Sequence, residues 1–109
     1  MNTHIAKFGI GQMVRHKNFP FRGVIFDVDY AYANSEQWWL AIPEADRPAK
    51  DQPYYHLLAE SDDGAYVAYV SEQNLAPDES GKPIEHPEAE FIFAGFDHGC
   101  YRPRPRPMH

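Results

Sequence analysis

The sequence holds one cysteine, no long apolar run, and fewer basic than acidic residues. Because Cys100 has no second cysteine to pair with, an internal disulfide is excluded, and we expect a reducing compartment, the cytoplasm. No stretch approaches 18 apolar residues, and residues 1–7 lack the apolar run of a signal peptide, so we expect neither a membrane span nor export. The 10 Lys and Arg against 16 Asp and Glu give a net charge of −6, which argues against nucleic-acid binding driven by charge alone.

The chain also has little room for long helices. Its 109 residues include 10 prolines and 7 glycines, which interrupt helices and favour short strands joined by turns. Apolar residues make up 43% of the chain and aromatic residues 15%, enough for one small core. The composition therefore predicts one domain built mainly from β-strands.

Four segments have the composition and alternation of strands: 10–16, 22–30, 53–60 and 65–70. The segment Asp62-Asp63-Gly64 predicts a hairpin turn between the last two. Gly23 inside the second segment indicates a bulge or a sharp bend. The expected core consists of Val14, Val24, Phe26, Val28, Leu57 and Val70, with the three residues of the second strand on one face.

Short helical segments are expected at two places. Ser35 is the predicted N-cap of a helix that ends near Ile42, before Pro43. Residues 71–75 predict one helical turn that leads into a short closing strand.

The chain changes character after Pro77. The apolar stretch 90–96 could add an edge strand, but the Arg-Pro run 102–107 is expected outside any ladder, because proline lacks the N–H donor. We therefore predict a barrel domain over residues 6–77 and a C-terminal extension over 78–109 that is loosely packed or mobile.

Four motifs resemble, in their order along the chain, the HspQ family, whose domain is also called the YccV-like or hemimethylated-DNA-binding domain. They are Phe8–His16, Arg22–Asp29, Pro53–Leu58 and Tyr69–Leu75. The resemblance implies a five-stranded, SH3-like barrel that assembles as a homo-oligomer, a trimer. It also implies two non-enzymatic roles: a heat-shock factor that promotes degradation of selected proteins by the Lon protease, and a protein that binds hemimethylated DNA.

We therefore predict an all-β fold, a small five-stranded SH3-like antiparallel barrel with one short helix and an extended C-terminal tail. The predicted function is that of a non-enzymatic regulator or adaptor with Lon and its client proteins as partners. The alternative is a module that binds hemimethylated DNA. No cofactor, metal or catalytic residue is expected.

Two sets of residues are candidates for partner contacts. Trp38 and Trp39 point about 100° apart on a helix, so one can pack on the core while the other contacts a partner. Phe91 and Phe93 form a second apolar candidate. The alternative reading, DNA contact, uses the basic residues Lys7, Arg15, Lys17 and Arg22, which could equally form a solvated face.

An enzyme reading rests on Asp27, Asp29 and His56, which could serve a metal-dependent hydrolase. The structural alternative is that the two carboxylates cap a turn or pair with Arg15 or Arg22 across strands. Gly9 and Gly11 precede a strand rather than a helix, so they mark where the chain enters the barrel and not a phosphate-binding loop. His98 and Cys100 match no zinc-site spacing.

Overall fold

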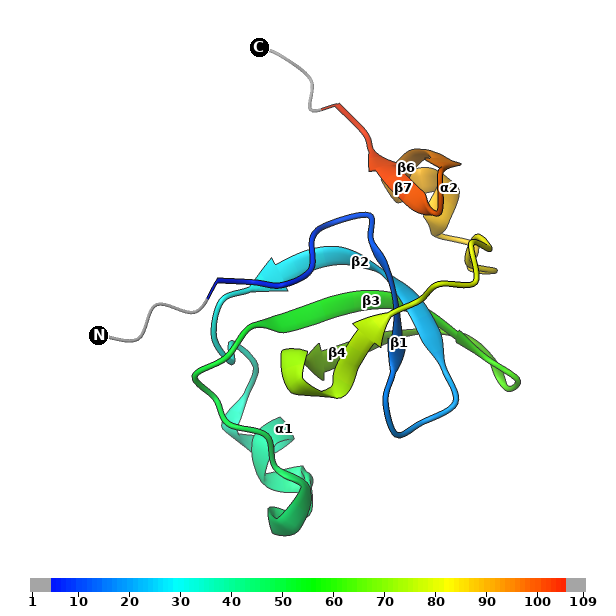
Figure 1. The fold of residues 1–109 in the computed structure, drawn as a ribbon. Helices are drawn as coiled ribbons and strands as arrows, with labels where there is room; N and C mark the ends of the chain where they lie inside the picture. Colours follow the sequence, from blue (N-terminus) through cyan, green and yellow to red (C-terminus); the bar gives the residue numbers. More distant parts are fainter. Residues whose placement is uncertain (1–4, 106–109) are drawn as a thin grey trace.

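A curved antiparallel sheet of five strands forms the centre of the structure, a computed structural model that describes residues 5–105 (Figure 1). The strands are β1 (Met13–His16), β2 (Arg22–Asp29), β3 (Tyr54–Ser61), β4 (Gly64–Ser71) and β5 (Leu75–Pro77). Their order across the sheet is β4-β3-β2-β1-β5, and every pairing is antiparallel. This confirms the predicted all-β, barrel-like fold.

The predicted helix is present between β2 and β3 as α1 (Glu36–Ala41). The hydroxyl oxygen of Ser35 accepts a hydrogen bond from the backbone N–H of Trp38 at 3.0 Å, which confirms the predicted N-cap. A 3₁₀ turn, η1 (Glu44–Asp46), follows α1, and a second, η2 (Glu72–Asn74), leads from β4 into β5 as expected. Within residues 5–105, no helix is long and apolar enough to cross a membrane.

The sheet carries apolar side chains on both faces, not on one. The first core lies inside the barrel and consists of Phe8, Val14, Ile25, Tyr55, Leu57, Val70 and Leu75. The second lies on the outer face and joins strand residues to the segment after β5: Met13, Val24, Leu58, Ile84, Ala89 and Phe93. Four of the six predicted core residues are buried, whereas Phe26 and Val28 are only partly buried.

A register shift in β2 explains this difference. Ile25 pairs with Leu57, but Asp27 pairs with His56, so the extra residue between them, Phe26, forms a bulge. The bulge interrupts the alternation, so Val28 packs against the inner core and Phe26 against the outer one. Of the two alternatives predicted for Gly23, a bulge or a sharp bend, the bulge is wrong, because Gly23 pairs regularly with Ala59.

Gly23 is required by close packing between β2 and β3. It pairs regularly with Ala59, and a Cβ atom on residue 23 would lie 2.8 Å from the carbonyl oxygen of Leu58. A side chain does not fit at this close approach of the two strands.

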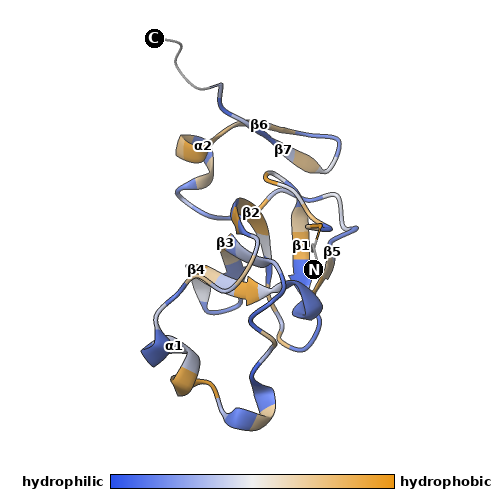
Figure 2. Cartoon of the chain, turned by 90° about the vertical axis from the view of Figure 1, so that its left-hand side faces the viewer, coloured by the Kyte–Doolittle hydropathy of each residue, from blue (hydrophilic) through white to orange (hydrophobic). Residues whose placement is uncertain are grey.

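The segment after β5 folds onto the outer face as α2 (Ala89–Ile92) and a hairpin of β6 (Phe93–Asp97) and β7 (Cys100–Pro103). In Figures 1 and 2 this hairpin lies at the opposite end of the molecule from α1. Arg102 and Pro103 belong to β7, so the expectation that the Arg-Pro run stays outside every ladder is wrong for these two residues. Pro103 lacks an N–H but is tolerated because β7 is an edge strand. Residues 106 and 107 of the run lie outside the described part.

Gly11 is the point where this hairpin meets the barrel. Its carbonyl oxygen accepts a hydrogen bond from the N–H of Tyr101 at 2.8 Å. Its φ of +91° favours glycine, and a Cβ atom would lie 2.1 Å from the carbonyl oxygen of Tyr101. The expectation that Gly11 serves chain geometry agrees with this position.

Candidate functional site

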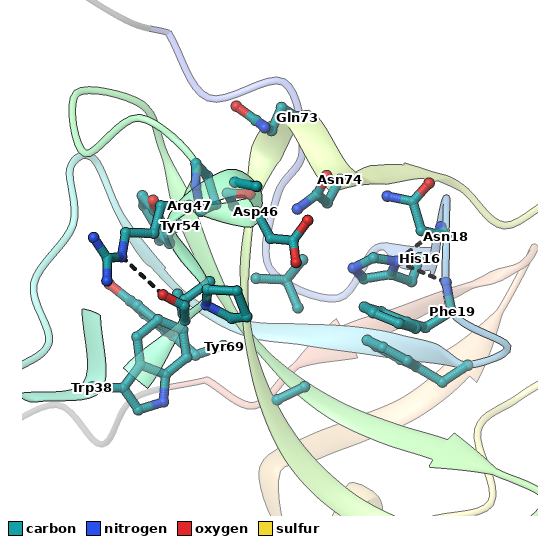
Figure 3. Close-up of a pocket in the computed structure, with 18 of the residues that line it drawn as sticks. His16, Asn18, Phe19, Trp38, Asp46, Arg47, Tyr54, Tyr69, Gln73 and Asn74 are labelled. Atoms are coloured by element: carbon teal, nitrogen blue, oxygen red, sulfur yellow. Dashed lines mark hydrogen bonds between the residues drawn. The ribbon is translucent and has the colours of Figure 1, made fainter. Parts of the chain in front are cut away.

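A groove of about 680 Å³ lies between the α1–η1 segment and the turn that joins β1 to β2 (Figure 3). We call it the aromatic groove, after six of its lining residues: Phe19, Phe21, Trp38, Tyr54, Tyr66 and Tyr69. In Figure 3, Trp38 and Tyr69 lie on one side of the groove and His16 and Phe19 on the other. Its volume lies within the range of ligand-binding clefts.

One wall of the groove is a packed set of aromatic rings. Tyr54 and Tyr69 stack with ring centroids 5.2 Å apart, and Trp38 meets Tyr69 edge-on at 5.5 Å. Tyr32 packs behind them, in contact with all three rings. Burial raises the pKa of Tyr54 and of Tyr69 to about 12, so both phenols stay neutral at physiological pH. The packed aromatic rings therefore add no charge to this wall of the groove.

The two adjacent tryptophans have different surroundings. Trp38 lines the aromatic groove with 37% of its surface exposed. Trp39 is half-buried, and the ammonium of Lys50 lies 4.8 Å above its ring. Lys50 also pairs with Glu36 at 3.0 Å, so Trp39 is covered by the chain itself. Of the two candidates, Trp38 is the one that a partner can reach in the groove.

The opposite wall is ordered by His16. Its Nδ1 accepts hydrogen bonds from the N–H groups of Asn18 and Phe19, at 3.0 and 3.1 Å. A ring that accepts at Nδ1 carries its proton at Nε2 and is neutral. Burial lowers the pKa of His16, which favours the same state. His16 thus holds Phe19, which is 63% exposed, at the rim of the groove, and adds no positive charge there.

The two residues of the second apolar candidate, Phe91 and Phe93, also differ in their exposure to solvent. Phe91 is 69% exposed, whereas Phe93 is 2% exposed in the outer core and packs against Tyr101 with centroids 5.1 Å apart. Phe93 therefore stabilises the fold, and only Phe91 is accessible to a partner. Sequence reasoning missed this because it did not foresee that the C-terminal segment covers the sheet.

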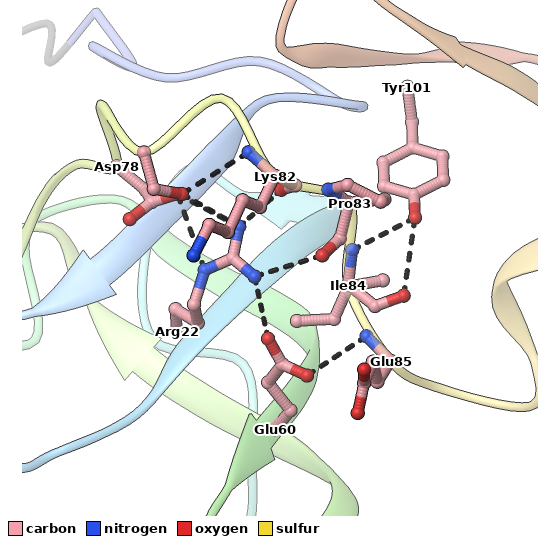
Figure 4. A network of polar contacts seen from close by, with 9 residues as sticks. Arg22, Glu60, Asp78, Lys82, Pro83, Ile84, Glu85 and Tyr101 are labelled. Carbon is pink, nitrogen blue, oxygen red and sulfur yellow. Dashed lines mark hydrogen bonds and ion pairs between the residues drawn. The ribbon is translucent and has the colours of Figure 1, made fainter.

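The four basic candidates are not equivalent. The residues Lys7, Arg15 and Lys17 are exposed. The Arg22 guanidinium is enclosed by Glu60 at 2.6 Å and Asp78 at 2.9 Å. It also donates to the carbonyl oxygens of Lys82 and Pro83 (Figure 4). The N–H donors of Arg22 therefore already bond to groups of the chain itself. This leaves Lys7, Arg15 and Lys17 as the candidates for contact with a phosphate.

The Arg22 network joins the barrel to the C-terminal segment. Figure 4 shows Arg22 between Glu60 of β3 and the loop that follows β5. Burial alone would raise the pKa of Asp78, but hydrogen bonds from Ser80 and Arg22 and the charge of Arg22 lower it. The second oxygen of Glu60 accepts from the N–H of Glu85 at 2.9 Å. The network therefore has a structural role that the sequence analysis did not identify.

Three residues of the enzyme reading lie together on the outer face. The ligand atoms of Asp27, Asp29 and His56 are all within 4.8 Å of one another. His56 Nε2 lies 2.8 Å from Asp29 Oδ2, and the Tyr69 hydroxyl donates to the same oxygen at 3.0 Å. The Asp29 carboxylate therefore bonds to His56 and Tyr69, whereas the Asp27 carboxylate accepts from the N–H of Val28 at 2.9 Å. Of the two structural alternatives, pairing with Arg15 or Arg22 is not found among residues 5–105.

A family model described as hemimethylated DNA-binding protein YccV like matches residues 6–100. The chain belongs to the YccV-like family. HspQ belongs to the same family, so the resemblance found from the four motifs is confirmed. The match extends past residue 77, and it therefore includes the outer-core segment for which the sequence offered no counterpart.

The YccV-like match covers each of the sites described above. The aromatic groove, the Arg22 network and the Asp27–Asp29–His56 cluster all lie between residues 6 and 100. The family description concerns DNA, yet this YccV-like chain has a net charge of −6. Among the described residues, its accessible features include three basic candidates, Lys7, Arg15 and Lys17, and the aromatic groove.

Proposed function

We propose that this YccV-like protein is a non-enzymatic adaptor that acts in the cytoplasm and promotes degradation of selected proteins by the Lon protease under heat stress. The observation that supports the proposal best is the aromatic groove with Trp38 in its wall. Tryptophan and tyrosine contribute strongly to protein–protein binding because they supply a large contact area at low conformational cost.

The groove suits an extended segment of another protein. Its aromatic wall is fixed by ring contacts, and the opposite rim is fixed by the two bonds to His16. A partner therefore meets a surface that is already ordered, which reduces the entropy lost on binding. Apolar side chains of a client or of the protease can contact Trp38 and Phe19 from opposite sides of the groove.

Reconstituted proteolysis tests the proposal. We expect the wild-type protein to accelerate Lon degradation of a client without being needed for the ATP hydrolysis of Lon. Trp38→Ala should abolish the acceleration. Leu40→Ala is the matched control, because Leu40 is 57% exposed on the same helix but does not line the groove.

Both variants are first checked for an unchanged melting temperature. Equal stimulation by Trp38→Ala and wild type would exclude the groove as the docking site. Absence of stimulation by the wild-type protein with any tested client would contradict the adaptor proposal itself.

A second candidate function, binding to hemimethylated DNA, is supported by the description of the family. Its contact residues would be Lys7, Arg15 and Lys17. Three phosphate contacts predict a slope of about −2.7 for log K against log salt concentration. We expect a preference for hemimethylated over unmethylated duplex that persists as salt rises, and an affinity reduced by Arg15→Glu/Lys17→Glu. Equal affinity for both duplexes at two salt concentrations would reject this candidate.

A further inference from the structure

A cluster of three potential metal ligands lies outside the aromatic groove and the basic candidates. Asp27 and Asp29 come from β2 and His56 from the neighbouring β3. Two carboxylates and one imidazole are a donor set that divalent transition metals accept. The potential ligand atoms lie within 4.8 Å of one another, and the His56 Nε2 to Asp29 Oδ2 distance is 2.8 Å. Donors that share one ion at normal bond lengths lie about 3.0–3.4 Å apart, so small side-chain rotations suffice.

The bulge in β2 creates this arrangement. Without it, Asp27 would alternate onto the same face as Ile25, which is buried in the inner core. The extra residue, Phe26, puts Asp27 opposite His56 on the outer face. Asp29 lies two residues further along the strand and therefore shares that face. Bulges recur beside functional sites because they redirect a side chain in this way.

Neighbouring side chains hold the cluster in place. The Tyr69 hydroxyl donates to Asp29 Oδ2 and accepts from the N–H of Ala33, both at 3.0 Å. The imidazole of His56 lies between the rings of Tyr69 and Phe26, with centroids 4.7 and 5.9 Å away. Fixed orientation of the ligands by surrounding hydrogen bonds is what supports metal affinity.

The charge of the cluster is not balanced by the chain. Across residues 5–105, neither Asp27 nor Asp29 forms an ion pair with a lysine or an arginine. The only partner of opposite charge that either has in this range is His56, and only when it is protonated. Two adjacent carboxylates repel one another, and a divalent cation removes that repulsion.

We propose that Asp27, Asp29 and His56 form a binding site for one divalent transition-metal ion of the zinc type, with solvent completing the coordination. The imidazole favours such an ion over Mg²⁺ or Ca²⁺, which prefer oxygen ligands alone. The site spans β2 and β3, so the ion stabilises the strand pair next to the bulge. It has no part in the adaptor function or in DNA binding as proposed above.

Titration of the full chain with zinc chloride, followed by calorimetry and by NMR of the histidine ring signals, tests this proposal. We expect the His56 signals to shift on addition of zinc and the melting temperature to rise. His56→Gln should weaken the affinity by about tenfold or more, and magnesium chloride should leave the His56 signals unchanged. Unchanged His56 signals at millimolar zinc would overturn the proposal.

A matched control separates this site from other zinc ligands in the chain. His98 lies 3.3 Å from Asp97 but is 93% exposed and has no third ligand from the described residues within reach. His98→Gln should therefore leave the affinity unchanged, and loss of binding in this variant alone would contradict the assignment. If His56→Gln does not fold, Asp27→Asn replaces it, because the one hydrogen bond of the Asp27 side chain within residues 5–105 comes from the N–H of Val28. That variant should also lose about tenfold in affinity, and wild-type affinity in it would overturn the site.

Discussion

Arg22 is the residue that connects the barrel to the segment after β5. Its guanidinium pairs with Glu60 and Asp78, and at most 20% of the surface of each of these three side chains is exposed to solvent. It also donates to two backbone carbonyls of the following loop. Such a partly buried ion pair contributes chiefly because its loss leaves the partner charges without compensation.

The first prediction follows from that network. Arg22→Ala should lower the free energy of unfolding by about 2 kcal/mol, because Glu60 and Asp78 lose their partner. Arg15→Ala, at the opposed position on β1, is the control and should change it by less than about 0.5 kcal/mol, because Arg15 is exposed. Urea denaturation measures both values, and equal effects would show that the network contributes nothing specific.

His16 gives the second prediction, a dependence of stability on pH. Burial lowers the pKa of His16, and its Nδ1 accepts two backbone hydrogen bonds that a protonated ring cannot accept. The unfolded chain binds the proton more readily, with a pKa of about 6.5. The contribution of His16 is therefore fully present above about pH 6.5 and is lost as pH falls through the lower pKa of the folded state.

Unfolding free energies measured between pH 8 and pH 5 test this dependence. His16→Gln should flatten the acid side of the profile. His98→Gln should leave it unchanged, because that ring is 93% exposed. A His16→Gln profile as steep as that of the wild type would contradict the assignment.

At the scale of the elements, local sequence patterns correctly predicted the strands of the five-stranded sheet and α1. Alternation, turn residues and the Ser35 cap act between near neighbours, so the sequence shows them directly. The bulge at Phe26 could not be predicted, because the register of β2 depends on its partner strand. The aromatic groove was only partly foreseen: Trp38 was a candidate, but its neighbours come from distant segments.

The outer core was missed for a related physical reason. Val24 and Leu58 are apolar in strands whose other face is already buried, a pattern that shows only once the register is known. The late apolar stretch could add an edge strand, and part of it does form a strand, β6. This strand pairs with β7 in a separate hairpin rather than with the five-stranded sheet, and Phe93 lies in the second core.

The third prediction compares the two phenylalanines of this stretch. Phe93→Ala should destabilise the protein by about 3 kcal/mol, because it leaves a cavity between the sheet and the hairpin. Phe91→Ala should cost less than about 0.5 kcal/mol, because Phe91 is 69% exposed. Thermal unfolding of both variants measures the difference, and a small effect of Phe93→Ala would mean that the outer core contributes little.

For the whole molecule, the fourth prediction concerns the boundary at residue 77. A chain that ends there would expose Met13, Val24 and Leu58, each at most 2% exposed in the full fold, and would lose Asp78 from the Arg22 network. We expect a lower melting temperature and binding of a hydrophobic dye. A chain that ends at Pro105 is the control and should behave as the wild type. Equal stability of both shortened chains would show that residues 6–77 fold independently.

The last prediction concerns oligomeric assembly, for which the family resemblance implies a trimer. Strand β4 has β3 as its only partner in the sheet formed by residues 5–105, and it exposes Val67 by 61% and Tyr66 by 39%. An exposed apolar edge strand pairs readily with another chain. We therefore expect light scattering at micromolar concentration to give three times the 12.6 kDa of one chain.

Val67→Lys tests whether this edge is the interface, because a charge at an edge strand opposes pairing. The variant should shift the mass to that of one chain. Asp63→Lys is its control, since it changes charge in the exposed turn before β4 and should keep the trimer. A monomeric wild-type protein would refute the predicted assembly. A Val67→Lys variant that remains trimeric would show that the subunits contact each other through a surface other than β4. A trimer that pairs through β4 would bury Tyr66, which lines the aromatic groove, and would therefore bring a neighbouring subunit to the edge of that groove.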